Sequence, residues 1–248
     1  MRGAAPRTEQ KEAGTIVEGE IRARVEQVRA RIAEAAQRAG RRPGGVELVA
    51  VSKAVSISRI REALDAGVAV LGENRVQEAR EKVPVLNSPA VTWHLVGHLQ
   101  TNKGKLAVEL FDLIHSVDSL KLAHVLDRHG ANLGKRVRVL IQVELGGETT
   151  KSGIREGHVI PLLHACRDLS HLAVEGLMIM PPFREHPEEV RPFFRQLREL
   201  RDRANDVCAE HHLVHLSMGM SHDFEVAIEE GATLVRIGTA IFGERPQD

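Results

Sequence analysis

The sequence is poor in the features that would tie a protein to a disulfide framework or a membrane. It has two cysteines, Cys166 and Cys208, without CxxC spacing, so we expect buried thiols in a reducing compartment and no disulfide scaffold or thiolate zinc site. No apolar run reaches the ~18 residues of a membrane span, and the N-terminus lacks the apolar core of a signal peptide. A cytoplasmic protein that does not enter a membrane is therefore predicted.

An excess of charge is also missing, because 34 Lys and Arg residues balance 34 Asp and Glu residues. No net field favours nucleic acid, so an anionic ligand must meet a local site. Thirteen histidines include the clusters His94/His98 and His211/His212/His215. These clusters lack an acidic ligand at a matching spacing, so no metal site is expected.

The length of 248 residues and the 42% hydrophobic content suffice for one sizeable core, which predicts a single domain. Residues 1–18 show no periodicity and are predicted to be a disordered tail. From Ile21 onward, apolar residues recur at helical spacing, and the segment stops at Gly40 and Pro43. This pattern predicts a helix before the first strand. Its apolar positions are Ile21, Val25, Val28 and Ile32. The folded domain is expected over residues 19–245.

Eight short apolar segments alternate with amphipathic stretches along the rest of the chain. They are VELVAVS, VAVLGE, VTWHLVG, FDLIHSV, VRVLIQVEL, LAVEGLMIM, LVHLSMG and TLVRIG. Several are apolar almost throughout, as strands buried on both faces of a parallel sheet must be, and each connection can hold a helix. No GxGxxG follows any of them, which argues against a dinucleotide-binding sheet. The pattern predicts an α/β protein with a (β/α)8 TIM barrel, an extra N-terminal helix and no second domain.

The first predicted strand ends at Lys53, and a barrel carries its site at the carboxyl ends of its strands. The apolar strand is expected to desolvate this amine, which lowers its pKa and leaves a neutral nucleophile that can form an imine. A lysine at a strand end can equally extend into solvent, so its position alone does not decide the role.

The last two predicted strands run into Gly- and Ser-containing turns at residues 217–221 and 236–239, where barrels hold phosphate. Ordinary turns also use Gly and Ser. If the turns are functional, four free amides could cradle a dianion, namely those of Gly219, Ser221, Gly238 and Thr239. An imine-forming lysine beside such a cradle indicates a phosphorylated carbonyl compound.

Arg236 stands in the apolar segment VRIG and needs a specific partner if it is buried. One candidate is a pyridine nitrogen, which a guanidinium would keep unprotonated. That would weaken the electron sink that transaminases obtain from Asp or Glu at this place. The alternative is a structural ion pair with an acidic residue such as Glu225.

Seven segments of the chain resemble the pyridoxal phosphate homeostasis protein family. They are AVSK (50–53), GENRVQEA (72–79), WHLVGHLQTNK (93–103), KSGI (151–154), EGLMIM (175–180), LSMGMSHDFEVAI (216–228) and VRIGTAIFG (235–243). The resemblance runs from about residue 46 to residue 243. It implies that the barrel is that of alanine racemase. Two departures are Arg75, where family members often have an aromatic residue, and Ala54 to Ser56, which lack the usual Thr or Pro.

The resemblance also implies a cofactor, pyridoxal 5'-phosphate (PLP), which Lys53 carries as an imine. Asn74 would lie beside its ring, and five residues would hold its nitrogen and phosphate, namely Ser217, Ser221, Arg236, Gly238 and Thr239. The complete set expected to bind the cofactor is Lys53, Asn74, Met178, Ser217, Gly219, Ser221, Arg236, Gly238 and Thr239. His94 is a weaker candidate to line the pocket, and Lys151 is placed outside it.

Three functions are weighed: a non-catalytic carrier in PLP homeostasis that serves PLP-requiring apo-enzymes, a PLP-dependent amino-acid racemase, and a lysine-imine aldolase. Racemase relatives supply a second base as a tyrosine from an additional C-terminal domain, whereas this sequence has no tyrosine and is expected to end with the barrel. The aldolase needs an acid and base pair, and the nearest carboxylates are Glu73, Asp118 and Glu144. A carrier without catalytic residues, as a monomer or weak homodimer, is therefore expected.

Overall fold

The computed structural model describes residues 19–86, 88–146, 152–208 and 210–244. The predicted tail over residues 1–18, the predicted domain end at residue 245 and Lys151 lie outside the described residues. In the described part, no helix is both long enough and apolar enough to cross a membrane. Cys166 and Cys208 are buried free thiols, as expected.

The described chain contains nine strands, and all of their pairings are parallel. They are β1 (Glu47–Val51), β2 (Val70–Glu73), β3 (Thr92–Leu95), β4 (Leu113–Val117), β5 (Val137–Glu144), β6 (Ile154–Arg155), β7 (Leu172–Ile179), β8 (His215–Met220) and β9 (Leu234–Ile237). The order β4-β3-β2-β1-β9-β8-β7-β5, with β4 also paired to β5, closes eight of them into a barrel. The predicted (β/α)8 fold is confirmed, and the two-residue β6 is an addition that pairs with β5.

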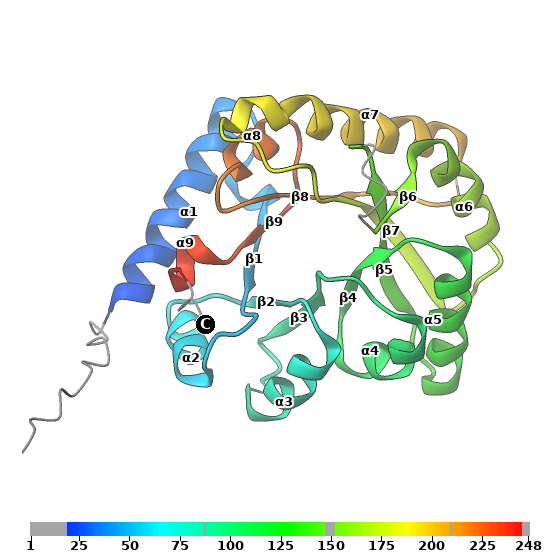
Figure 1. Ribbon diagram of the computed structural model, residues 1–248, viewed down its shortest axis with the longest axis horizontal. Helices are drawn as coiled ribbons and strands as arrows, with labels where there is room; N and C mark the ends of the chain where they lie inside the picture. The colour runs from blue at the N-terminus through cyan, green and yellow to red at the C-terminus, as the bar shows by residue number, and fades with distance from the viewer. Residues whose placement is uncertain (1–18, 87, 147–151, 209, 245–248) are drawn as a thin grey trace, which may run out of the picture.

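Helices occupy the connections and surround the barrel as an outer ring (Figure 1). They are α1 (Glu20–Arg38), α2 (Ile57–Asp65), α3 (Val76–Leu86), α4 (Gly104–Leu110), α5 (Leu120–Leu133), α6 (Val159–Cys166), α7 (Arg191–Val207), α8 (Phe224–Glu229) and α9 (Thr239–Phe242). Four 3-10 turns are η1 (Pro43–Gly45), η2 (Thr101–Lys103), η3 (Glu156–His158) and η4 (Pro187–Val190).

The extra N-terminal helix α1 forms as the apolar spacing predicts. Its buried residues include Ile21, Val25, Val28 and Ile32, and it packs against α2, α8 and α9. Figure 1 shows α1 beside α8 and α9, outside the last strands of the barrel. Burial of one apolar stripe against neighbouring helices is the main source of stability for such a helix.

Two apolar cores flank the strands. The larger one fills the space between strands and helices, and the smaller one lies inside the barrel. The inner core consists of Val49, Val70, Val96, Leu113, Leu140, Met178 and Leu234, with Val51 packed against it. Because side chains alternate along a strand, the same strands contribute residues to both cores.

Candidate functional site

The carboxyl ends of the strands surround a cavity of about 260 Å³. Its lining residues are Val51, Lys53, Asn74, Val96, Met180, Met220, Ser221, His222, Arg236, Gly238 and Thr239. Six of the predicted binding residues are in this set: Lys53, Asn74, Ser221, Arg236, Gly238 and Thr239. Six of the nine sequence-predicted residues therefore line one cavity, and the lining also contains Met180, Met220 and His222, which were not predicted.

Lys53 and Thr239 also border a second cavity of about 330 Å³, which continues toward the C-terminal helix α9. On the other side, Asn74 borders a groove of about 630 Å³ that extends past Arg75 and His98. The candidate site is thus open toward neighbouring hollows at the same end of the barrel.

Charged side chains of α3 form hydrogen bonds with the backbone on both sides of Lys53. Lys82 Nζ donates to the carbonyl oxygen of Ser52 at 2.6 Å, and Glu78 Oε2 accepts from the amide of Ala54 at 3.0 Å. Ala54 has a positive φ of 57°, which is unusual for a residue with a Cβ. The contacts on both sides of Lys53 explain how this strained turn persists.

The same cluster contains Glu73, which is fully buried at the end of β2. Its Oε1 accepts hydrogen bonds from Lys82 Nζ and from the Ser52 hydroxyl, both at 2.7 Å. Burial raises the pKa of Glu73, although the bonds from Lys82 and Ser52 oppose that shift. Sequence reasoning did not assign this supporting role, although Glu78 and Lys82 stand at the i, i+4 spacing of a helical ion pair.

Arg236 is 4% exposed, and its guanidinium donates hydrogen bonds to two uncharged acceptors. Its Nη1 donates to Ser217 Oγ at 2.6 Å, and its Nη2 donates to the Ile179 carbonyl at 2.8 Å. No carboxylate lies within ion-pair distance of it among the described residues, and Glu225 pairs instead with Arg31 of α1 at 2.7 Å. The structural ion pair with Glu225 is therefore not formed.

Burial lowers the pKa of Arg236 to about 10, and the charge of Asp223 partly opposes this shift. A guanidinium that is buried without a carboxylate is costly, and such groups are kept where a ligand or a reaction needs them. Because Arg236 lines the cavity, an acceptor on a bound molecule can complete its contacts.

The turns after β8 and β9 meet at the Ser221 hydroxyl. Ser221 Oγ accepts hydrogen bonds from the amides of Gly238 and Ala240, both at 3.3 Å. The expectation that the Gly238 amide is free is therefore wrong, because the Ser221 hydroxyl already satisfies it. Thr239 is the first residue of α9, so its amide has no acceptor within that helix.

Three predicted binding residues do not line the cavity. Met178 is fully buried in the inner core, while Met180, two residues later and just past the end of β7, lines the cavity. Gly219 has a φ of 90°, and a Cβ there would stand 2.6 Å from the Cβ of Ala227 in α8. Its backbone thus packs against a helix. Ser217 is fully buried and contacts the cavity residue Arg236.

Two buried histidines continue inward from Ser217. His115 Nδ1 lies 2.8 Å from Ser217 Oγ, and His115 Nε2 lies 3.1 Å from His94 Nδ1. His94, the weaker candidate for the pocket, is 2% exposed and does not line the cavity. Burial lowers the pKa of His94 to about 3 and that of His115 well below its usual value.

A group of potential metal ligands lies on α6 and just after the end of α7, and none of its members lines the cavity. His164 Nδ1 lies 3.1 Å from Glu210 Oε1, and Cys208 Sγ lies 3.7 Å from His164 Nε2. These contacts satisfy the three side chains as hydrogen bonds. The absence of a metal site stays a prediction.

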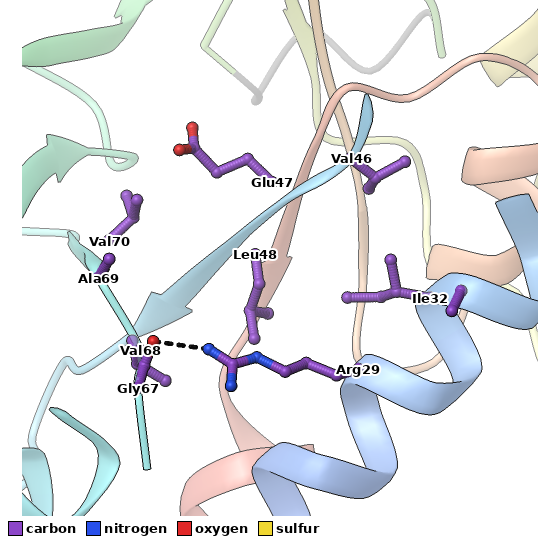
Figure 2. A pocket seen from close by; sticks show the side chains of 10 residues that line it. Arg29, Ile32, Val46, Glu47, Leu48, Gly67, Val68, Ala69 and Val70 are labelled. Carbon is purple, nitrogen blue, oxygen red and sulfur yellow. Dashed lines mark hydrogen bonds between the residues drawn. The ribbon is translucent and has the colours of Figure 1, made fainter. Parts of the chain in front are cut away.

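The amino ends of β1 and β2, together with α1, border another cavity of about 320 Å³ (Figure 2). Figure 2 shows Arg29 of α1 reaching toward the start of β2, where it donates to the carbonyl of Gly67 at 2.6 Å. It also donates to the carbonyl of Ala66 at 3.1 Å. This arginine joins α1 to the α2–β2 turn, and no predicted binding residue lies here. The opposite mouth is therefore the candidate site.

Comparison with known proteins agrees with the sequence resemblance. The family model of the alanine racemase N-terminal domain matches residues 24–246. The pyridoxal phosphate homeostasis protein of Aquifex aeolicus (strain VF5) is 47% identical over 224 residues, which cover 90% of this chain and 97% of that protein.

Two solved structures are also similar to this chain. PipY of Synechococcus elongatus PCC7942, with PLP bound, is 38% identical and gives a TM-score of 0.81, covering 90% of this chain and 100% of that one. Alanine racemase of Clostridium difficile 630 is 14% identical and gives a TM-score of 0.69, covering 93% of this chain and 58% of that one, so it shares the fold. From the match with the Aquifex aeolicus protein, the chain belongs to the pyridoxal phosphate homeostasis protein family.

Proposed function

We propose that this protein binds PLP at the carboxyl end of its barrel, carries it as an imine on Lys53 and takes part in cytoplasmic PLP homeostasis. The observation that carries the proposal is one cavity lined by both Lys53 and the buried Arg236, whose guanidinium has no carboxylate partner among the described residues. PipY, 38% identical to this chain, has a structure with PLP bound.

The residues present fit this cofactor. Lys53 offers the primary amine that condenses with an aldehyde and releases water, and the Arg236 guanidinium offers donors to a ring nitrogen. Asn74 would lie beside the ring. The Ser221 hydroxyl and the Thr239 amide would hold the phosphate, because both lie where the turns after β8 and β9 meet. When bound, the cofactor supplies an aldehyde that reacts reversibly with amines.

The carrier role follows from what surrounds these residues. Arg236 donates hydrogen bonds only, so it would keep a ring nitrogen unprotonated and limit the electron-withdrawing power of the ring. Among the described residues that line the cavity, His222 is the one besides Lys53 whose side chain could act as a proton-transfer base. We infer that the protein holds PLP and passes it to PLP-requiring apo-enzymes, with little turnover of its own.

An absorbance spectrum of the protein after loading with PLP tests the proposal. An imine on Lys53 absorbs in the near-visible region, and borohydride reduction followed by peptide mapping should place the cofactor on the peptide that contains Lys53. Absence of a near-visible band, or a label found chiefly on Lys103, Lys105 or Lys151, would contradict the assignment. The spectrum also separates the carrier from a cofactor-free aldolase.

A further inference from the structure

A chain of four buried polar side chains crosses the interior of the barrel beneath the cavity. It runs from Arg236 on β9 to Ser217 on β8, His115 on β4 and His94 on β3. The exposed fractions are 4%, 0%, 0% and 2%, in that order. The surrounding inner core is apolar, so water cannot replace these contacts without opening the barrel.

The chemistry of the first contact sets the direction of the remaining hydrogen bonds. A guanidinium has donors only, so the Ser217 oxygen must accept from Arg236 Nη1. The single hydroxyl hydrogen of Ser217 can then be donated to His115 Nδ1. In this tautomer His115 Nε2 carries the proton and donates it to His94 Nδ1. Every hydrogen bond in the chain then points away from Arg236.

This arrangement requires both imidazoles to be neutral. Burial lowers the pKa of His94 to about 3, and burial is also the main cause of the lowered pKa of His115. A neutral His115 can accept the Ser217 hydrogen, whereas a protonated one would have two donors and would repel the nearby guanidinium. The two histidines therefore add acceptor capacity beneath Arg236 without adding positive charge.

We propose that His115, supported by His94, is a positioning residue that orients the Ser217 hydroxyl and thereby fixes the Arg236 guanidinium toward a ring nitrogen in the cavity. The role rests on the proposed function, because the ring nitrogen that Arg236 would contact belongs to bound PLP. His115 does not line the cavity, so it acts only through Ser217 and Arg236. A lone histidine in the apolar segment FDLIHSV gives no sequence signal for this role.

The test compares two ligands: PLP and an analogue in which the ring nitrogen is replaced by C–H. Wild type should bind PLP at least about tenfold more tightly than the analogue, as expected for one charge-assisted hydrogen bond. His115→Phe, which removes both ring nitrogens, should lose about tenfold in affinity for PLP and little for the analogue. Affinity is followed by titrating the near-visible band.

Three further variants keep the test decisive. Ser116→Ala is the matched control, because Ser116 is the next residue on β4, is equally buried and has no hydrogen-bond partner for its hydroxyl among the described residues. It should leave the preference unchanged. His115→Gln retains amide hydrogen bonding and should recover part of the preference. If His115→Phe fails to fold, Ser217→Ala removes the same link and should lose the preference.

The possible outcomes separate this proposal from the proposed function. Equal weakening of both ligands in His115→Phe would mean that His115 only supports the fold, and an unchanged preference would mean that it has no role. Either result overturns the positioning role while leaving PLP binding intact. A wild type that forms no near-visible band with PLP would overturn the proposed function, and with it this proposal.

Discussion

At the residue scale, two basic side chains with different chemistry share one cavity. Lys53 is half-buried on a turn, whereas Arg236 is almost fully buried on a strand and held by a hydroxyl and a carbonyl. A lysine can lose its proton and form a covalent bond, while an arginine keeps its charge and can only donate. The cavity therefore combines a reactive amine with a fixed cation.

Replacement of the lysine should separate cofactor attachment from folding. We expect Lys53→Ala to abolish the near-visible band and the borohydride label while the barrel stays folded, because the stability lies mainly in the apolar cores. A purely structural ion partner would instead cost about 3–5 kcal/mol when removed. The variant should keep weak affinity for PLP through the phosphate contacts. Thermal unfolding and peptide mapping measure the two effects.

The matched control is Lys105→Ala, since the Lys105 side chain is 73% exposed on α4. It should retain both the band and the label on the Lys53 peptide. Loss of the fold in Lys53→Ala, or an undiminished band, would contradict the prediction.

The buried histidines should make the fold sensitive to acid. The pKa of His94 is lowered from 6.5 to about 3 by burial, so below pH 6.5 the unfolded chain binds a proton that the folded protein does not. Stability should therefore fall as the pH falls between these values, by about 2 kcal/mol for this residue at pH 5. Urea unfolding at pH 7 and pH 5 measures the difference.

The contribution of His94 can be isolated from that of other groups. His94→Gln removes the titration but keeps an amide near His115, so it should lose less stability between pH 7 and pH 5 than wild type does. The absolute stability of the variant at pH 7 is not the readout. The same loss in both proteins would show that His94 does not titrate differently on folding.

At the element scale, the turn after β8 depends on a glycine that packs against a helix. Gly219 has a φ of 90°, and a Cβ there would lie 2.6 Å from Ala227 Cβ and 2.9 Å from Phe224 Cα. We expect Gly219→Ala to destabilise the protein by about 1–3 kcal/mol, because both the backbone conformation and the close contact oppose the methyl group. Thermal unfolding checks this.

Gly157→Ala provides the comparison, since a Cβ at Gly157 meets nothing within 4 Å and its φ is not in the left-handed region. This variant should be close to wild type in stability. If both variants are equally stable, α8 can move away from β8 more easily than the packing indicates.

The turns after β8 and β9 should together determine how the phosphate group contributes to binding. We expect inorganic phosphate to compete with PLP loading, and pyridoxal, which lacks the phosphate, to bind much more weakly. The reason is that the Ser221 hydroxyl and the Thr239 amide, the first of α9, lie at this one place in the cavity wall. Titrations of the near-visible band with each compound measure this. Equal affinity for pyridoxal and PLP would remove the phosphate site from the proposal.

The sequence predicted the strands better than it predicted which individual side chains reach the cavity and which are buried beneath it. All eight predicted strands form, because apolar segments and long connections report burial and parallel pairing directly. The two-residue β6 gave no such signal. Met178 lies in β7 and Met180 just past its end, and the sequence pattern cannot tell which of them reaches the cavity. His115 was missed because its partners come from β8 and β3, far away in the chain.

At the scale of the whole molecule, the closed barrel brings residues from its first and last strands into one wall. β1 pairs with β9, so Lys53, on the turn after β1, and Arg236 line the same cavity although they are widely separated in sequence. Closure of the barrel therefore places motifs from both ends of the domain around a single cavity. The expected monomer or weak homodimer stays a prediction.

The residues that line the cavity also determine whether the molecule could act as a racemase. Racemisation needs a base on each side of the substrate, and Lys53 can supply only one. His222 is the other lining residue that could act as a base, but its ring contacts Phe183 with centroids 5.4 Å apart, and its Nε2 lies 3.0 Å from the Glu185 carbonyl. That carbonyl can only accept, so Nε2 carries the proton and only Nδ1 could act as a base.

We therefore expect negligible racemase or transaminase turnover with common amino acids. The measurement is exchange of the α-proton of alanine in deuterated water by the PLP-loaded protein, followed by NMR, with Lys53→Ala as the blank. His222→Gln is the informative variant, because it removes the one other group among the described lining residues that could act as a base. Wild type and His222→Gln should both match the blank. Robust exchange by wild type would contradict the prediction, and its disappearance in His222→Gln would identify His222 as the base that removes the α-proton.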